Sequence, residues 1–224
     1  MFGSYDDLPA ASNCSSLYMN LRHHLMHQRN AGSTHNFWSG FGAVRRGAFL
    51  DLGGFESKSF PEPSVEDIEF GHRLADDGGR ALLDPGLLCT HLKHWSLRNL
   101  VHTDCVHRAL PWSQLLIRNG GRGMTLNVSR AERGRAIVAL SALFATLFSL
   151  VGVLSWWSSV PLIVATLLLN RSLVKLIYQR GGAVPAFFGA LYHQIYYVYS
   201  TAIYMGCWLS ALGRRLFRRR ALPA

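Results

Sequence analysis

The sequence has few cysteines, and they form no pattern typical of a metal site or a disulfide framework. Four cysteines are spread over 224 residues without a CxxC pair, and the last lies in an apolar run. This spacing predicts free thiols in a reducing compartment. The chain also opens without the basic start and apolar core of a secretory signal, so we expect no signal peptide at Met1.

Acidic residues are absent after Glu132, and this makes the net charge of +10 uneven. Residues 1–135 hold 15 Lys and Arg against 13 Asp and Glu, whereas the rest holds eight Lys and Arg and no acid. Basic residues beside apolar segments are typical of anchors to an anionic membrane face. A nucleic-acid-binding protein would instead gather its basic residues in a stripe that contacts phosphates. We therefore expect a membrane partner and no nucleic acid.

Charge is also absent from long apolar segments in the last third of the chain. Residues 136–154 form an uncharged run of about 19 residues, which is the length of a membrane-spanning helix. A Trp-Trp turn at 156–157 and a second apolar run at 161–170 follow, and residues 183–212 contain only His193 as an ionisable group. These segments predict membrane helices with a basic tail.

The basic clusters at 130–135, 171–180 and 214–220 all favour the cytoplasmic side of a membrane. Three complete crossings would place the last cluster outside. A two-crossing hairpin followed by an interfacial or kinked segment satisfies all three clusters, and a further crossing upstream would satisfy the tail alone. The number of crossings therefore stays open.

The first part of the chain mixes short apolar segments with glycine turns. We expect helices and strands at the following positions: helices at 12–28, 45–52 and 65–77, strands at 37–44, 81–83 and 87–91. Gly53-Gly54 is the expected stop of the second helix. Ser64 is the expected cap of the third.

Glu66 and Asp67 stand at the predicted start of the third helix, next to a glycine-rich turn. A transfer that makes a hydroxyl group nucleophilic needs a base within hydrogen-bond reach, and a carboxylate on a helix-start loop can point into a cleft. The alternative is that both acids only stabilise the positive end of the helix dipole.

Three motifs in order resemble the acceptor-side half of family 2 glycosyltransferases with the GT-A fold. They are Gly40-Phe41-Gly42-Ala43-Val44-Arg45-Arg46, Phe49-Leu50-Asp51-Leu52-Gly53-Gly54-Phe55, and Glu66-Asp67-Ile68-Glu69-Phe70-Gly71-His72-Arg73-Leu74. The resemblance covers roughly residues 1–118 and is specific in the combination of motifs. It implies an α/β fold, a partial GT-A-like domain, followed by an α-helical transmembrane region.

The resemblance also implies roles for individual residues. Asp67 would be the general base with Glu66 as the supporting acid, and Trp38 and Gly40 would belong to the acceptor-side loop. His91, at the end of a short strand, would help to bind Mg²⁺ or Mn²⁺. The alternatives are a surface histidine or a hydrogen-bonded histidine in the domain wall.

His107-Arg108-Ala109-Leu110-Pro111-Trp112 resembles the late Arg/Trp motif of the same family, with altered spacing. Arg108 would then contact phosphate and Trp112 would stack on a sugar ring. An interfacial amphipathic helix is the alternative for this segment.

No Asp-x-Asp precedes Glu66, so we expect the donor-binding half of such an enzyme to be missing and the isolated chain to have little activity. The expected domains are a partial GT-A-like domain at 1–118, a basic interfacial linker at 119–135 and transmembrane helices at 136–224. The expected function is transfer of a sugar from a nucleotide-sugar donor to a lipid-linked or cell-envelope acceptor, with inversion. The expected location is the cytoplasmic membrane, with the soluble part facing the cytoplasm. The alternative is a non-catalytic membrane module that binds or assembles a partner enzyme.

Overall fold

The computed structural model describes residues 1–60, 63–121 and 126–220, and leaves the side chains of 127 and 217–220 undescribed. The strands are β1 (Phe2–Tyr5), β2 (Gly32–Thr34) and β3 (Ala81–Cys89). The α-helices of the first part are α1 (Cys14–Arg29), α2 (Arg46–Asp51), α3 (Glu66–Asp76), α4 (Leu97–His102) and α5 (Leu110–Arg118), and those of the second part are α6 (Arg130–Leu150), α7 (Trp156–Leu169), α8 (Arg171–Gly181) and α9 (Ala183–Arg220). The mostly helical α/β class is confirmed at this level.

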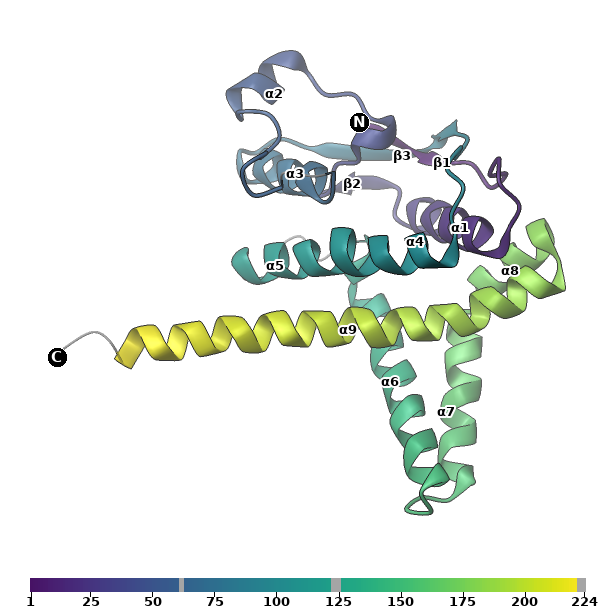
Figure 1. Cartoon of the computed structure of the whole chain (residues 1–224). Coiled ribbons are helices and arrows are strands. Elements are labelled where there is room, and N and C mark those ends of the chain that lie inside the picture. The colour runs from purple at the N-terminus through teal and green to yellow at the C-terminus, as the bar shows by residue number, and fades with distance from the viewer. Residues whose placement is uncertain (61–62, 122–125, 221–224) are drawn as a thin grey trace.

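The chain forms successive layers (Figure 1). The sheet, with α1 and α3, lies on one side of the row formed by α4, a π-helix at Thr103–Ala109 (η2) and α5. Helix α9 runs along the other side of that row, and the α6–α7 hairpin projects away from α9. The arrangement separates a mixed α/β part from a helical hairpin.

The sheet has the order β1-β3-β2, with β1 parallel and β2 antiparallel to β3. The register shifts between Phe2, which pairs with Leu83, and Ser4, which pairs with Leu88. The segment predicted as a turn between two strands is therefore an irregularity inside one strand. Pro85 has no N–H for the ladder, and the Asp84 carboxylate accepts a bond from the Gly86 N–H at 2.9 Å, so this segment leaves the regular pairing.

The strand predicted at 37–44 is wrong. A 3₁₀ turn, η1 (Ser39–Phe41), forms there instead. Asp67 accepts hydrogen bonds from Ser39, and Gly40 leaves room for the indole of Trp38 to fold back over the turn. The chain is therefore held by a tertiary contact in a shape that local β propensity does not predict.

Helices α1, α2 and α3 lie within two residues of their predicted bounds. Gly53 and Gly54 have φ values of +77° and +67°, the left-handed region that glycine enters without strain, and they end α2. The predicted cap by Ser64 is wrong, because the Ser64 hydroxyl donates to the carbonyl of His107 at 2.8 Å and Val65 occupies the cap position. Ser64 thus ties the start of α3 to the π-helix.

Two apolar cores hold the layers together. One lies beside the sheet and includes Phe2, Phe37, Phe70 and Leu83. The other joins α1 and α4 to α8 and α9, and its members are Leu17, Tyr18, Met19, Leu21, Trp95, Leu100, Leu173, Ile177, Ala186 and Tyr192. Because α8 buries Leu173 and Ile177 in this second core, α8 packs on the first part of the molecule rather than extending the hairpin.

The hairpin of α6 and α7 exposes large apolar side chains along both arms. They include Leu143, Phe144, Leu147, Phe148, Val160, Ile163, Val164 and Leu167. By length and composition α6 is a candidate membrane span among the described helices, and the pair α7 and α8, bent by 60°, is a second candidate. Polar surface is what water-exposed helices normally present, so this apolar surface is typical of contact with lipid or with another protein.

Candidate active site

Asp67 is buried at the first turn of α3, where the residue is 8% exposed. Its Oδ2 accepts bonds from the N–H of Ser39 at 2.9 Å and from the Ser39 hydroxyl at 3.0 Å. Its Oδ1 accepts a bond from the N–H of Ile68 at 2.8 Å. Burial raises the pKa of the Asp67 carboxyl, and the bonds from Ser39 oppose that rise. Asp67 thus joins α3 to the η1 turn and has the raised basicity that proton abstraction uses.

Glu66 lies beside Asp67 and is half-buried. Its Oε2 accepts a bond from the N–H of Ser64 at 2.6 Å. The Glu66 charge also contributes to the raised pKa of Asp67. The predicted supporting acid therefore holds the loop before α3 and adds negative charge near the predicted base.

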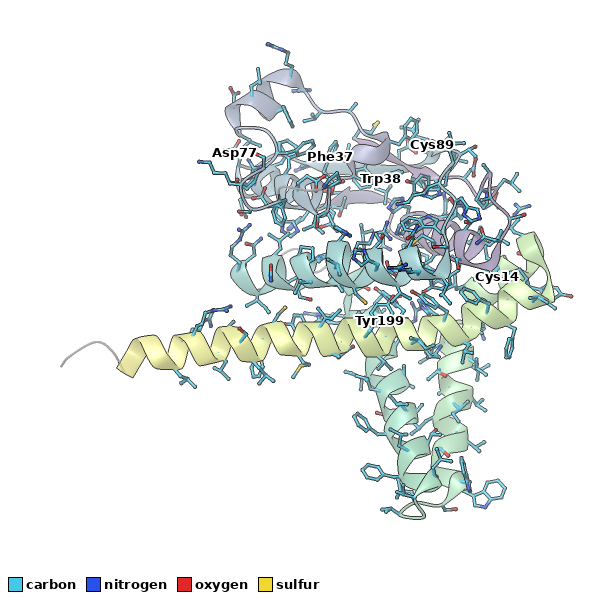
Figure 2. The ribbon with its side chains drawn as sticks, in the orientation of Figure 1. Cys14, Phe37, Trp38, Asp77, Cys89 and Tyr199 are labelled. Carbon is cyan, nitrogen blue, oxygen red and sulfur yellow. The ribbon has the colours of Figure 1, made fainter. Side chains whose placement is uncertain are left out.

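Trp38 covers the η1 turn and brings it next to the sheet (Figure 2). Its ring meets the Tyr5 ring edge-on at 4.6 Å between centroids, and the His27 ring at 5.3 Å. A Cβ at Gly40 would come within 2.6 Å of the Trp38 indole. The fold of this turn therefore requires glycine at position 40, and it brings Trp38 and Gly40 together with Asp67 through Ser39.

His91 follows β3 and is 6% exposed. Its ring meets Tyr5 edge-on at 4.4 Å and stacks on Trp95 at 6.2 Å. Burial, then the charges of Arg108 and Lys93, lower the pKa of His91, so the imidazole is neutral at neutral pH. Its Nδ1 has no hydrogen-bond partner within the described residues. The Tyr5 ring therefore contacts both His91 and Trp38, two of the residues predicted for the site.

Basic side chains converge around Trp95 next to His91. Lys93 Nζ lies 3.8 Å from the Trp95 ring centroid, and the Arg108 guanidinium lies 5.6 Å from it. Burial and then the Arg108 charge lower the pKa of Lys93. Burial, and after it Arg108 and Arg22, lower the pKa of His23 well below its usual range. These positive groups oppose each other's protonation, and a bound anion would offset the repulsion between them.

Arg108 is already held on one side. Its Nη1 donates to Asp104 Oδ1 at 3.2 Å and lies 3.0 Å from the sulfur of Met19. Trp112 is on α5, one helical turn further along, and its buried Nε1 has no partner in the described part of the chain. The structure brings Arg108 to the His91 cluster, whereas Trp112 makes no ring contact with that cluster within the described residues.

A buried polar network, which the sequence did not predict as a whole, lies between α1, the π-helix and α9. Asp104 accepts bonds from Arg22 at 3.2 Å and from the Tyr199 hydroxyl at 2.8 Å. Figure 2 shows Tyr199 on α9 beside the row of α4 and α5. The sequence marked His193 as the ionisable group of an apolar run, but ion pairs such as Arg22–Asp104, 82 residues apart, leave no local pattern.

The same network reaches the base of the hairpin. His193 is hydrogen-bonded to the Tyr18 hydroxyl at 2.8 Å and to the Tyr197 hydroxyl at 3.1 Å. The Tyr197 hydroxyl lies 2.9 Å from Glu132 Oε2 and 3.1 Å from Asn170 Oδ1. Because Glu132 belongs to α6 and Asn170 follows α7, one tyrosine connects both arms to α1 through His193.

The residues present do not complete a metal site. Within residues 1–60, 63–121 and 126–220 no group of three His, Cys, Asp or Glu side chains is placed to hold a metal ion. His91, the predicted ligand, would need ligands from elsewhere. The Mg²⁺ or Mn²⁺ implied by the resemblance therefore stays a prediction.

Family models, curated proteins and solved structures were each searched, and none matches this chain.

Proposed function

We propose that this chain supplies the acceptor-side and membrane portions of a membrane-associated, family 2-like glycosyltransferase. The observation that carries the proposal is the buried Asp67, whose pKa is raised and which holds the η1 turn through Ser39. Trp38, which precedes that turn and packs over Gly40, would offer its half-buried indole for a sugar ring to stack on. The exposed apolar hairpin would place this site at a membrane surface.

In the proposed reaction the Asp67 carboxylate takes the proton from an acceptor hydroxyl. The hydroxyl oxygen then attacks the anomeric carbon of a nucleotide sugar, and the bond from that carbon to the diphosphate oxygen breaks. The electron pair leaves with the nucleoside diphosphate, and the configuration inverts. Arg108 and Lys93 would bind the anionic leaving group, with Trp112 bordering the acceptor. The donor-binding strands would come from chain outside this sequence.

The test is sugar transfer by the complete enzyme in membranes, with this chain and the donor-binding half both present, and with radiolabelled nucleotide sugars. Replacing Asp67 with Asn should lower the transfer rate about 100-fold or more, because general-base catalysis contributes about 10²–10⁴-fold. The matched control is Ser39→Ala, which removes a hydrogen bond to the same carboxylate but keeps the base. An unchanged rate in D67N rejects Asp67 as the base.

A second candidate is a non-catalytic module that assembles a partner enzyme at the membrane. The engagement of Arg108 by Asp104 favours it, because a phosphate would have to share or displace that contact. In this case D67N and wild-type membranes would transfer sugar at the same rate, and loss of the chain would lower the amount of the partner enzyme in the membrane.

A further inference from the structure

A groove of about 530 Å³ lies between α5 and α9, away from the cluster around His91. It is within the size range of sites for small molecules. The residues that line it are Leu110, Gln114, Ile117, Arg118, Ile203, Gly206, Cys207, Ser210, Ala211 and Arg214. The groove is therefore lined mainly by apolar side chains, with one arginine from each helix.

The charged residues that line the groove are basic. Arg118 and Arg214 line it, and none of the described residues that line it is acidic. Arg214 Nη1 donates to the Ser210 hydroxyl at 2.8 Å, which holds the guanidinium on the groove side of α9. Such a pair of guanidinium groups beside apolar side chains suits a phosphate joined to a hydrocarbon chain.

The face of α9 that points away from the groove is apolar. Beyond residue 200, α9 exposes Met205, Trp208, Leu209, Leu212 and Leu216. Figure 1 shows α9 running across the base of the α6–α7 hairpin, with α5 alongside it. If the hairpin enters a bilayer, these α9 side chains reach the headgroup zone, where amphipathic helices bury their apolar face. The groove, on the opposite face of α9, then lies one helix diameter from the headgroup zone.

Arg118 also connects the groove to α3. Its Nη2 lies 4.0 Å from Glu69 Oε1, and Glu69 is in the same first turn as Asp67. The Arg118 side chain is 53% exposed, and Glu69 keeps two bonds of 2.9 Å from Arg73, so Arg118 is free to turn toward a ligand. A ligand held by Arg118 would thus lie beside the first turn of α3.

We propose that this groove binds the lipid acceptor through an anionic phosphodiester, with its hydroxyl-bearing head directed toward α3. The inference rests on the proposed function, because it names the acceptor class of the same enzyme. Arg118 and Arg214 bind the phosphodiester, and the apolar side chains of α5 and α9 contact the first carbons of the chains. The occupant is the phospholipid phosphatidylglycerol, whose head carries free hydroxyl groups.

Cys207 provides the readout, because it lines the groove. The purified chain in a non-ionic detergent is treated with a maleimide in the presence of dioctanoyl phosphatidylglycerol, and the rate at each cysteine is followed by peptide mass spectrometry. Cys14 and Cys89, on α1 and β3, are internal controls in the same molecule. We expect the lipid to slow alkylation at Cys207 about tenfold and to leave Cys14 and Cys89 unchanged.

Three variants make the test specific. Arg118→Gln and Arg214→Gln should each remove most of the protection, since a charge-assisted bond to phosphate contributes about 1.5–3 kcal/mol, or about tenfold or more in affinity. Arg215→Gln is the matched control, because Arg215 is exposed, loses the same charge and does not line the groove. Equal protection by dioctanoyl phosphatidylcholine, or equal loss in R215Q, would overturn the proposal.

Asp67→Asn separates this inference from the proposed function. Protection of Cys207 should be unchanged in D67N, because Asp67 does not line the groove. If the lipid still protects Cys207 but D67N membranes keep full sugar transfer, Asp67 is rejected as the base and the groove remains a lipid site. Loss of transfer in D67N without any protection of Cys207 in the wild type would keep the function and reject the groove.

Discussion

At the scale of single residues, the candidate site depends on buried groups whose ionisation is opposed by their surroundings. Asp67 is buried with hydrogen bonds from the η1 turn, and His91 is buried between Tyr5 and Trp95. Burial raises the pKa of the Asp67 carboxyl and lowers the pKa of the His91 imidazole. Both shifts favour the neutral forms, which is typical of sites that handle protons or charged ligands.

The raised pKa of Asp67 predicts a pH-dependent effect on stability. A carboxyl whose folded pKa exceeds its unfolded pKa contributes stability that is present below the unfolded pKa, about 3.9, and is lost as pH rises through the folded pKa. Replacing Asp67 with Asn removes this loss. The Tm of D67N relative to wild type should therefore be higher at neutral pH than at pH about 4.

Thermal unfolding in detergent at the two pH values measures this difference. The matched control is Asp51→Asn, because Asp51 is exposed on α2. Its Tm difference from wild type should be the same at both pH values. A D67N difference that does not change with pH would contradict the raised pKa of Asp67.

At the scale of elements, the π-helix at Thr103–Ala109 is the junction between α1 and α9. Its Asp104 is 2% exposed and accepts bonds from Arg22, Arg108 and Tyr199. Single π turns within α-helices are rare and often occur at functional sites, because the extra residue redirects side chains. Asp104 and Arg108 both lie in this π-helix.

Breaking this junction should strongly destabilise the fold. Replacing Asp104 with Asn leaves the buried Arg22 without its counter-charge, and loss of one partner of a buried ion pair costs about 3–5 kcal/mol. Chemical denaturation in detergent, followed by circular dichroism, measures the change. Asp51→Asn, on the exposed surface of α2, should change stability by no more than about 0.5 kcal/mol. A similar small effect of D104N would show that the pair adds little.

At the scale of the whole molecule, the hairpin and α9 determine how the chain would meet a membrane. Residues 136–170 contain no charged side chain, and the basic residues lie at the base of the hairpin and along α8 and α9. The turn between α6 and α7, at the far end of the hairpin, satisfies many of its backbone N–H groups by hydrogen bonds within the hairpin. The N–H groups of Val151, Gly152, Val153 and Leu154 all donate to carbonyls of the last turn of α6. Such internal bonding is what a turn inside lipid requires.

This arrangement predicts that the base of the hairpin and the end of α9 lie on one side of the membrane. Gly134 on α6 and Gly213 on α9 both face open space, so cysteine fits at either position. A membrane-impermeant maleimide should label G134C and G213C in inverted vesicles and neither in intact cells. Labelling of G213C from the opposite side to G134C would indicate an odd number of crossings between them.

The sequence predicted the elements that depend on local chemistry. Gly53-Gly54 marked the end of α2, and the acids at 66–69 marked the start of α3, because backbone conformation and the helix dipole act within a few residues. The apolar runs located the hairpin, because the length of an uncharged run is read directly from the sequence. Local pattern also grouped Glu66 with Asp67, but it could not show that Asp67 would be buried.

Only the tertiary structure decided which distant groups meet. The 3₁₀ turn at Ser39–Phe41 replaced a predicted strand because Asp67, 28 residues away, holds Ser39. Arg22, Asp104 and Tyr199 form one network although they lie on α1, the π-helix and α9, and the groove between α5 and α9 has no counterpart in the linear pattern. Burial and charge pairing depend on distance in space, whereas sequence periodicity records only the face that each element buries.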